Sequence, residues 1–180
     1  GSEMCIRDSY KRGFGSKVTY LFKHALIQDA AYESLLKSNR KEYHLALAQA
    51  LEQHYPDRVE TQPELVARHY TEAEVFEPAL KYWQIASGRA MSHAAMQEAG
   101  GHLQEILSII DALPESPELQ GMELGTRLMY GGVLFATQGP GSPNVRTNFE
   151  RANVLCDAVG GPAERCLLYT SDAADEPMRV

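Results

Sequence analysis

Apolar residues recur along most of the chain at steps of three and four, the spacing that places them on one face of an α-helix. Two stretches show this pattern most clearly, residues 77–92 and 96–113. The first carries Leu80, Trp83, Ala86 and Ala90, and the second carries Met96, Ala99, Leu103, Ile106, Ile110 and Leu113. Each stretch is therefore predicted to be an amphipathic helix with one buried face.

Further helices are predicted on both sides of these two. Residues 24–37 show helical spacing, and capping or proline signals mark four later starts. These starts are Asn39 with Glu42, Thr61 with Pro63 and Glu64, Ser116 with Pro117, and Ser142 with Pro143. The last two helices carry Leu124, Leu128 and Phe135, and then Val145, Phe149, Ala152, Cys156 and Val159. Seven helices are expected in total.

One short stretch, VTYLF at 18–22, alternates with a period of two and is predicted to be a strand. Its pairing partner is expected upstream, in sequence that this chain lacks. Tyr20 and Phe22 would then form a sticky apolar edge that favours self-association.

The pattern as a whole predicts an all-α fold. Short loops and alanines at close-packing positions favour antiparallel helical hairpins stacked as a tetratricopeptide-like solenoid, with one short N-terminal strand remnant. The fit to that repeat is imperfect. The pair at 117–137 and 143–159 follows the previous pair by more than the usual period of about 34 residues, and Gly100-Gly101 lies within a helix.

Composition narrows the classes of partner. A formal net charge of −7 argues against nucleic-acid or anionic-membrane binding, which Lys and Arg drive. No apolar run approaches the roughly 20 residues of a membrane span, and the start lacks a secretory signal pattern, so a soluble cytoplasmic protein is expected. Cys5, Cys156 and Cys166 are too far apart for a zinc or thiol-redox motif, and Cys156 falls on an apolar stripe as a small buried residue.

The stretches YLFKHALIQDAAYESLLKSNRKEYHLALAQALE and ETQPELVARHYTEAEVFEPALKYWQIASGRA resemble part of large bacterial signalling ATPases. In that family, a STAND-type AAA-like ATPase is joined to a class III adenylate or guanylate cyclase or a DNA-binding domain, and to a tetratricopeptide-repeat arm. The resemblance runs from about residue 20 to 160. The matching positions are Phe22, His24, Ala25, Tyr32, Leu35, Arg40, His44, Ala67, His69, Tyr70, Ala73, Ala79, Tyr82, Trp83 and Ala86.

The resemblance also implies a division of the chain. Residues 10–60 would end a winged-helix-like module, and residues 61–165 would form the helical repeat region. GSEMCIRDS at 1–9 resembles the translation of a transposase-type sequencing adapter, and CLLYTSDAADE, which opens the tail 166–180, resembles the opposite strand of the same element. Both ends are therefore set aside as adapter-like, as any non-native scar would be.

The sequence predicts no catalytic, cofactor-binding or metal-binding residues. No phosphate-binding G-x-x-x-x-G-K-[ST] motif, paired cyclase carboxylates or H-E-x-x-H spacing is present. For His24 and His44, interhelical hydrogen bonding near Tyr32 and Arg40 is preferred over ligand binding. Trp83 is interpreted as a core residue, and no cofactor is expected.

The expected partner is a protein or peptide, including other domains of the parent chain, because stacked helices present an extended surface. Lys81, Gln84 and Arg89 lie off the buried stripe of their helix and are the candidate contact residues. The leading hypothesis is a non-catalytic regulatory arm of a cyclase-like ATPase. The alternatives are the effector-sensing region of an ATP-dependent transcription activator and, more remotely, a hydrolase that uses His24 or His44.

Overall fold

A computed structural model of the 180-residue chain describes residues 9–12, 19–22 and 25–159. Side chains are described from residue 26 to residue 159, except those of residues 27 and 28. In residues 9–12, 19–22, 25, 27 and 28, only the backbone is described. The helices are α1 Ala25–Glu33, α2 Lys37–His54, α3 Pro56–Thr61, α4 Pro63–Glu72, α5 Phe76–Ser92, α6 Met96–Asp111, α7 Pro117–Gln138 and α8 Pro143–Val159. Two short strands, β1 Ser9–Arg12 and β2 Thr19–Phe22, precede them.

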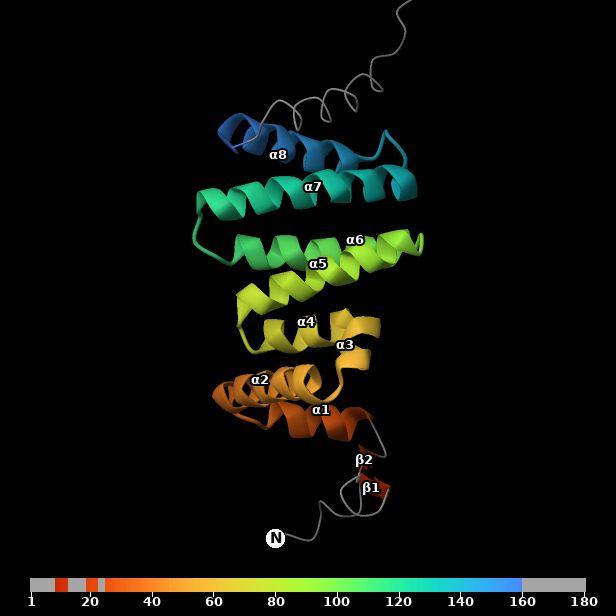
Figure 1. Cartoon of the computed structure of the whole chain (residues 1–180), viewed down its shortest axis with the longest axis vertical. Coiled ribbons are helices and arrows are strands. Elements are labelled where there is room, and N and C mark those ends of the chain that lie inside the picture. Colours follow the sequence, from red (N-terminus) through yellow and green to blue (C-terminus); the bar gives the residue numbers. More distant parts are fainter. Residues whose placement is uncertain (1–8, 13–18, 23–24, 160–180) are drawn as a thin grey trace, which may run out of the picture.

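The described part of the chain is all-α apart from this strand pair, and its helices form one long row. Figure 1 shows successive helices lying one above another along the long axis, with the chain reversing direction between them. α2 packs on α4, and from α4 to α8 each helix packs on the next one in sequence. This arrangement leaves the outward sides of the helices uncovered by other described elements.

Two of the reversals use the same backbone geometry, twenty residues apart. The N–H of Val75 donates to the carbonyl of Tyr70, and the N–H of Ala95 donates to that of Ala90, both at 2.9 Å. The residue before each of these donors, Glu74 or Ala94, has a φ of 57°. This six-to-one hydrogen bond closes a helix by a left-handed residue, which satisfies its last carbonyls and turns the chain back.

The stripes predicted for residues 77–92 and 96–113 lie in the core, whereas Tyr43 and Leu47, predicted on the stripe of the helix after Asn39, are exposed. One apolar cluster runs from Ala48 and Leu51 of α2 to Val133 of α7 and contains Leu103 and Ile106, both 0% exposed. A second cluster joins α7 and α8 through Leu124, Ala152, Leu155 and Cys156. The prediction that Cys156 is buried is confirmed. The first cluster crosses residue 60, although the domain boundary placed there stays a prediction.

Several predicted helix ends are wrong. α2 begins at Lys37 behind Leu36, with no side-chain cap, so Asn39 lies inside the helix. The hydroxyl of Thr61 donates to the carbonyl of Asp57 at 2.9 Å and closes α3, a short helix that periodicity did not indicate. The proline starts are correct: Ser116 accepts a hydrogen bond from the N–H of Leu119 at 3.2 Å and caps α7.

Two further expectations fail in the described part of the chain. Phe135, predicted on the buried stripe of its helix, is 41% exposed because it lies in the last turn of α7, outside both apolar clusters. The partner of β2 is not missing: β1 pairs with it antiparallel, with Ser9 opposite Phe22 and Arg12 opposite Thr19. The described residues contain eight helices, since α3 adds one to the seven predicted.

Glycine permits close contacts between helices at two positions. A Cβ placed on Gly131 of α7 would lie 2.5 Å from Cζ of Phe149 on α8. The phenyl ring therefore packs directly on the α7 backbone. Gly100, which looked unfavourable within its helix, is buried, and a Cβ there would lie 3.3 Å from Val133 Cγ1 of α7. Gly100 lowers the helix propensity of α6, but it also allows α6 and α7 to pack closely at this point.

Candidate functional site

The three candidate contact residues lie on the outward side of α5. Lys81, Gln84 and Arg89 are all exposed, and their spacing places them on one face of the helix together with Ile85, which is 45% exposed. The Arg89 guanidinium donates to the carbonyl of Glu60 at 2.9 Å. This face is therefore polar, with one apolar side chain among its long cationic and amide groups.

Arg89 also lines a shallow cleft of about 170 Å³. The cleft lies where α5 meets the start of α4 and the α5–α6 turn. Its other lining residues are Thr61, Glu64, Ala86, Ala90, His93, Ala95 and Glu98. The α5 face and this cleft are continuous through Arg89.

A second polar site lies where α1, α2 and α4 meet. The Tyr32 hydroxyl lies 2.9 Å from Nε2 of His44, and Nδ1 of His44 lies 2.8 Å from Nδ1 of His69. Of two facing ring nitrogens, one must donate and the other accept, so at least one of the two rings is not doubly protonated while this contact exists. Burial first, and then the neighbouring His44 and Arg68, lower the pKa of His69, while Glu72 opposes them.

Arg40 stands beside this chain of hydrogen bonds. Its guanidinium carbon lies 5.1 Å from the Tyr32 ring centroid, and its Nε donates to the carbonyl of Leu35 at 3.2 Å. Four family-matching positions, Tyr32, Arg40, His44 and His69, are thus in one cluster. Their contacts are the interhelical kind that the sequence favoured over ligand binding.

A cleft of about 290 Å³ opens on the outer side of this cluster. It is lined by Tyr32, Lys37, Arg40, Lys41, Thr71, Glu72 and Glu74. Glu74, from the α4–α5 turn, binds Lys41 and lies 3.6 Å from Lys37. The hydrogen bond from Lys41 lowers the pKa of Glu74, and the two lysine charges add to this effect.

Two tyrosines share one carboxylate between α2, α4 and α5. The hydroxyls of Tyr70 and Tyr82 donate to the two oxygens of Glu52 at 2.5 Å and 2.6 Å, and their rings stack with centroids 6.1 Å apart. Burial and the Glu52 carboxylate raise the pKa of Tyr70 and raise that of Tyr82 to about 12. Both hydroxyls therefore stay protonated as donors, and Tyr70 has a structural role.

The remaining family-matching positions divide into core and undescribed residues. Trp83 is 4% exposed, and its indole N–H donates to the Thr71 hydroxyl at 3.0 Å, so it is a core residue as predicted. Phe22 lies in β2, where only the backbone is described, and His24 lies outside the described residues.

Sequence reasoning missed a charged group between α7 and α8. Glu123 is 3% exposed and accepts from Arg127 at 2.7 Å and from Arg151 at 2.9 and 2.8 Å. Burial alone would raise the pKa of Glu123, but the hydrogen bonds from Arg151 and Arg127 outweigh it and keep the pKa low. The i, i+4 spacing of Glu123 and Arg127 could have indicated the ion pair between them. Arg151 is 28 residues from Glu123, so no local spacing indicates the second ion pair.

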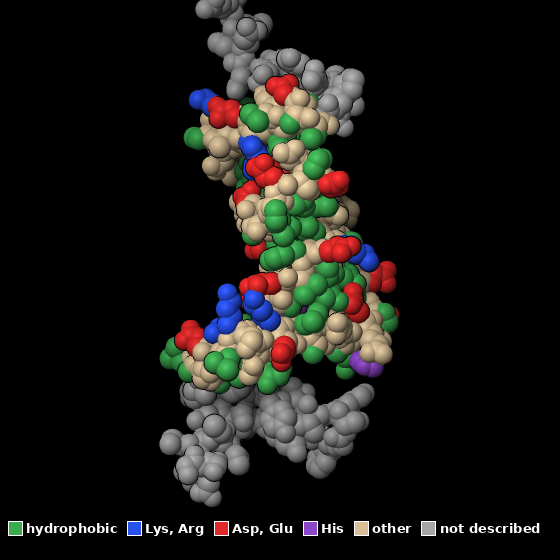
Figure 2. Space-filling model, turned by 90° about the vertical axis from the view of Figure 1, so that its left-hand side faces the viewer, with side chains coloured by type: hydrophobic (Ala, Val, Ile, Leu, Met, Phe, Trp, Pro, Cys, Tyr) green, Lys and Arg blue, Asp and Glu red, His purple; other side chains and the backbone are tan. Residues whose placement is uncertain are grey.

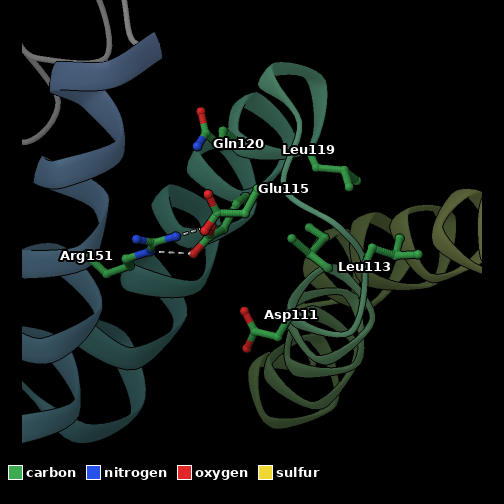
Figure 3. Close-up of a pocket in the computed structure, with 8 residues that line it drawn as sticks. Asp111, Leu113, Glu115, Leu119, Gln120 and Arg151 are labelled. Atoms are coloured by element: carbon green, nitrogen blue, oxygen red, sulfur yellow. Dashed lines mark hydrogen bonds and ion pairs between the residues drawn. The ribbon is translucent and has the colours of Figure 1, made fainter.

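Figure 3 shows the pocket in front of this group, with Arg151 reaching across from α8 and Asp111 and Glu115 pointing toward the same space. The pocket holds about 110 Å³ and lies beside the α6–α7 connection. The hydrogen bond to Glu123, and then the charges of Glu115 and Asp111, raise the pKa of Arg151. Two of its guanidinium N–H groups, on Nε and Nη2, are thus already used by Glu123.

No group of three or more His, Cys, Asp or Glu residues within the described ranges is arranged to hold a metal ion. Among the described helices, none is long and apolar enough to cross a membrane.

The chain is similar to an uncharacterized protein of Rhizobium meliloti (strain 1021), with 27% identity over 136 residues. The match covers 76% of this chain and 13% of the relative, so the chain spans only a small part of that protein's length. Since 136 residues make up 13% of it, the relative is about a thousand residues long. No protein family profile matches the chain, and no solved structure matches it.

Proposed function

We propose that this chain is a non-catalytic interaction and regulatory arm of a large, multidomain, ATP-dependent bacterial signalling protein of the adenylate or guanylate cyclase-like kind. The arm binds protein or peptide segments, including other domains of its own parent chain. In this proposal the helices are tetratricopeptide-like hairpins, and the outward face of α5 is the contact surface.

The observation that carries the proposal is the exposed face of α5 on a row of helices in which, from α4 to α8, each described helix packs on the next one in sequence. Lys81, Gln84 and Arg89 are exposed there around Ile85, and the α4 and α6 contacts use the opposite side of the helix. A row of this kind presents a long surface without closing around a small molecule. Peptides and folded domains fit such surfaces.

The polar groups between the helices support the same proposal. The His44–His69 pair, Glu52 with its two tyrosines, and Glu123 with its two arginines all join one helix to another. Their hydrogen bonds hold one helix to the next within the fold. A regulatory arm needs such rigidity if movement at one end is to reach the other. The length of the Rhizobium meliloti relative supports a multidomain parent.

The decisive test uses the full-length parent. Charge reversal on the α5 face, Lys81→Glu with Arg89→Glu, should change the regulation of the parent's ATPase or cyclase rate. The matched control reverses two exposed arginines elsewhere in the row, Arg68→Glu on α4 and Arg146→Glu on α8, and should leave regulation unchanged.

A separate measurement addresses the non-catalytic part of the proposal. Isothermal titration of the 180-residue chain with Mg-ATP should give no saturable heat, and incubation should give no hydrolysis above buffer. Tight ATP binding or turnover by this chain would contradict the proposal. A parent that ends in a DNA-binding domain and lacks a cyclase domain would favour the transcription-activator alternative.

A further inference from the structure

The cleft at the α1–α2–α4 junction collects more positive than negative charge. Lys37, Arg40 and Lys41 project into it from α2, against the carboxylates of Glu72 and Glu74. Figure 2 shows Lys and Arg side chains gathered near the lower end of this side of the molecule, with acidic side chains beside them. This local excess contrasts with the chain's net charge of −7.

The start of α2 adds to this excess. The helix begins behind Leu36, with no side-chain hydrogen bond to its first amides and no acidic residue in its first turn. The N-terminal end of a helix carries a partial positive charge on its free N–H groups. Here that end coincides with the three cations of the cleft, and the helix dipole reinforces their field.

Arg40 is the cation best prepared to receive a ligand. The Tyr32 ring and the Leu35 carbonyl hold its guanidinium in place, and they use only the Nε–H donor and one face of the group. Among the described residues, no carboxylate pairs with it. A guanidinium offers five N–H donors in a fixed plane, so its outer donors remain suited to a planar anion.

We propose that this cleft binds a carboxylate side chain of an acidic peptide segment, with Arg40 as the anchor and Lys37 and Lys41 as the flanking cations. The proposal deepens the proposed function, on which it rests, by naming a second contact site and its ligand chemistry. The cleft already holds one carboxylate, that of Glu74 on Lys41. Three cations against two carboxylates leave room for one more single negative charge, which favours a carboxylate over a dianionic phosphate.

Glu74 is then an internal competitor. It sits on the turn between α4 and α5, where its backbone has a φ of 57°, and it shares Lys41 with any incoming carboxylate. Neutralising Glu74 should free Lys41 and strengthen peptide binding. A residue that only supported the fold would not produce a gain of this sign.

The test is a nitrogen-15 NMR titration of the full chain with an acetylated and amidated peptide, Ala-Glu-Ala-Ala, which carries a single negative charge. We expect saturable shifts at the Arg40 Nε–H and at the backbone amides of 37–41, and no such shifts with the matched peptide Ala-Gln-Ala-Ala. Lys37→Gln, at a side chain that is 80% exposed, should weaken binding about two- to fivefold, as expected for one exposed ion pair. Glu74→Gln should tighten it by a similar factor.

The controls separate the sources of an anion. Inorganic phosphate should bind more weakly than the acidic peptide, and tighter phosphate binding would overturn the carboxylate assignment. Equal binding of the glutamine peptide, or no effect of Lys37→Gln and Glu74→Gln, would overturn the site itself. Arg40→Lys should weaken binding while the amide spectrum stays folded. None of these outcomes bears on the ATP titration, so the two proposals can fail separately.

Discussion

The α2–α4 junction and the α7–α8 hairpin both place polar side chains between helices, but they do so with different chemistry. At the first, the half-buried rings of His44 and His69 contact each other, and two tyrosine hydroxyls share Glu52. At the second, the carboxylate of Glu123 is 3% exposed and bound by two guanidinium groups. One contact depends on keeping a base neutral, and the other depends on keeping an acid charged.

Because of this difference, the two regions should lose stability in different pH ranges. Burial lowers the pKa of His69 from its ordinary value of 6.5, so protons favour the unfolded chain as the pH falls below that value. The arginines lower the pKa of Glu123 from 4.5, so its contribution to stability is complete above that value and is lost only in stronger acid. Mild acid should therefore act on the α2–α4 junction first.

The largest effect is expected from Glu123→Ala. The substitution leaves the Arg127 and Arg151 guanidinium groups against each other without their shared carboxylate, and should destabilise the protein by about 3 kcal/mol. Urea unfolding followed by circular dichroism measures the change. Glu150→Ala, at an exposed site on α8, should cost less than about 0.5 kcal/mol. A loss of the same small size for Glu123→Ala would show that the charged group does not hold the hairpin.

The next effect concerns the close contact of α7 with α8. Gly131→Ala places a methyl group 2.5 Å from the Phe149 ring and should cost about 1–3 kcal/mol through forced repacking. Gly132→Ala, one residue on with open space around it, should instead stabilise by about 0.5–1 kcal/mol through helix propensity. Opposite signs in thermal melts are the expected result, and equal signs would contradict the packing.

A smaller loss is expected at the other end of the row. Glu52→Ala removes the acceptor of both the Tyr70 and Tyr82 hydroxyls and should cost about 1–2 kcal/mol, since the site is only half-buried and water can replace the carboxylate. Hydrogen exchange should then show faster opening of α2 with α8 unchanged. Faster exchange of α8 alone would contradict the separation of the two regions.

The smallest effect is the pH dependence that His69 confers. Stability should fall as the pH drops from about 7.5 to 5.5, because the unfolded chain takes up a proton at this ring that the folded chain resists. His69→Gln should flatten this part of the profile, whereas His54→Gln, at an exposed site, should not. A profile unchanged by His69→Gln would exclude this ring as its source.

Helix positions and the buried stripes could be predicted from the sequence. Leu103, Ile106 and Trp83 lie in the core where their three- and four-residue spacing placed them, and Ser116 caps its helix. These features depend on residues within one or two turns of each other. The residues that determine these features therefore lie within a short window of sequence.

Two of the wrong helix ends, the start of α2 at Lys37 and the short helix α3, belong to helices that pack on α4. The capping residues Asn39 and Thr61 predicted helix starts from local sequence alone, but in the packed structure the helices begin at Lys37 and Pro63. Of the candidate site, Lys81, Gln84 and Arg89 could be placed outward from periodicity, but the cleft around Arg40 could not.

The sequence by itself determined that the described part of the chain is mainly helical, which face of α4, α5 and α6 is buried, and that α7 and α8 begin at proline. Only the tertiary structure decided which polar groups meet: His44 with His69, Glu52 with Tyr82, and Glu123 with Arg151. These partners lie 25 to 30 residues apart in the chain. Hydrogen bonds and charge pairs act over a few ångströms in space, so no local pattern specifies them until the helices are packed.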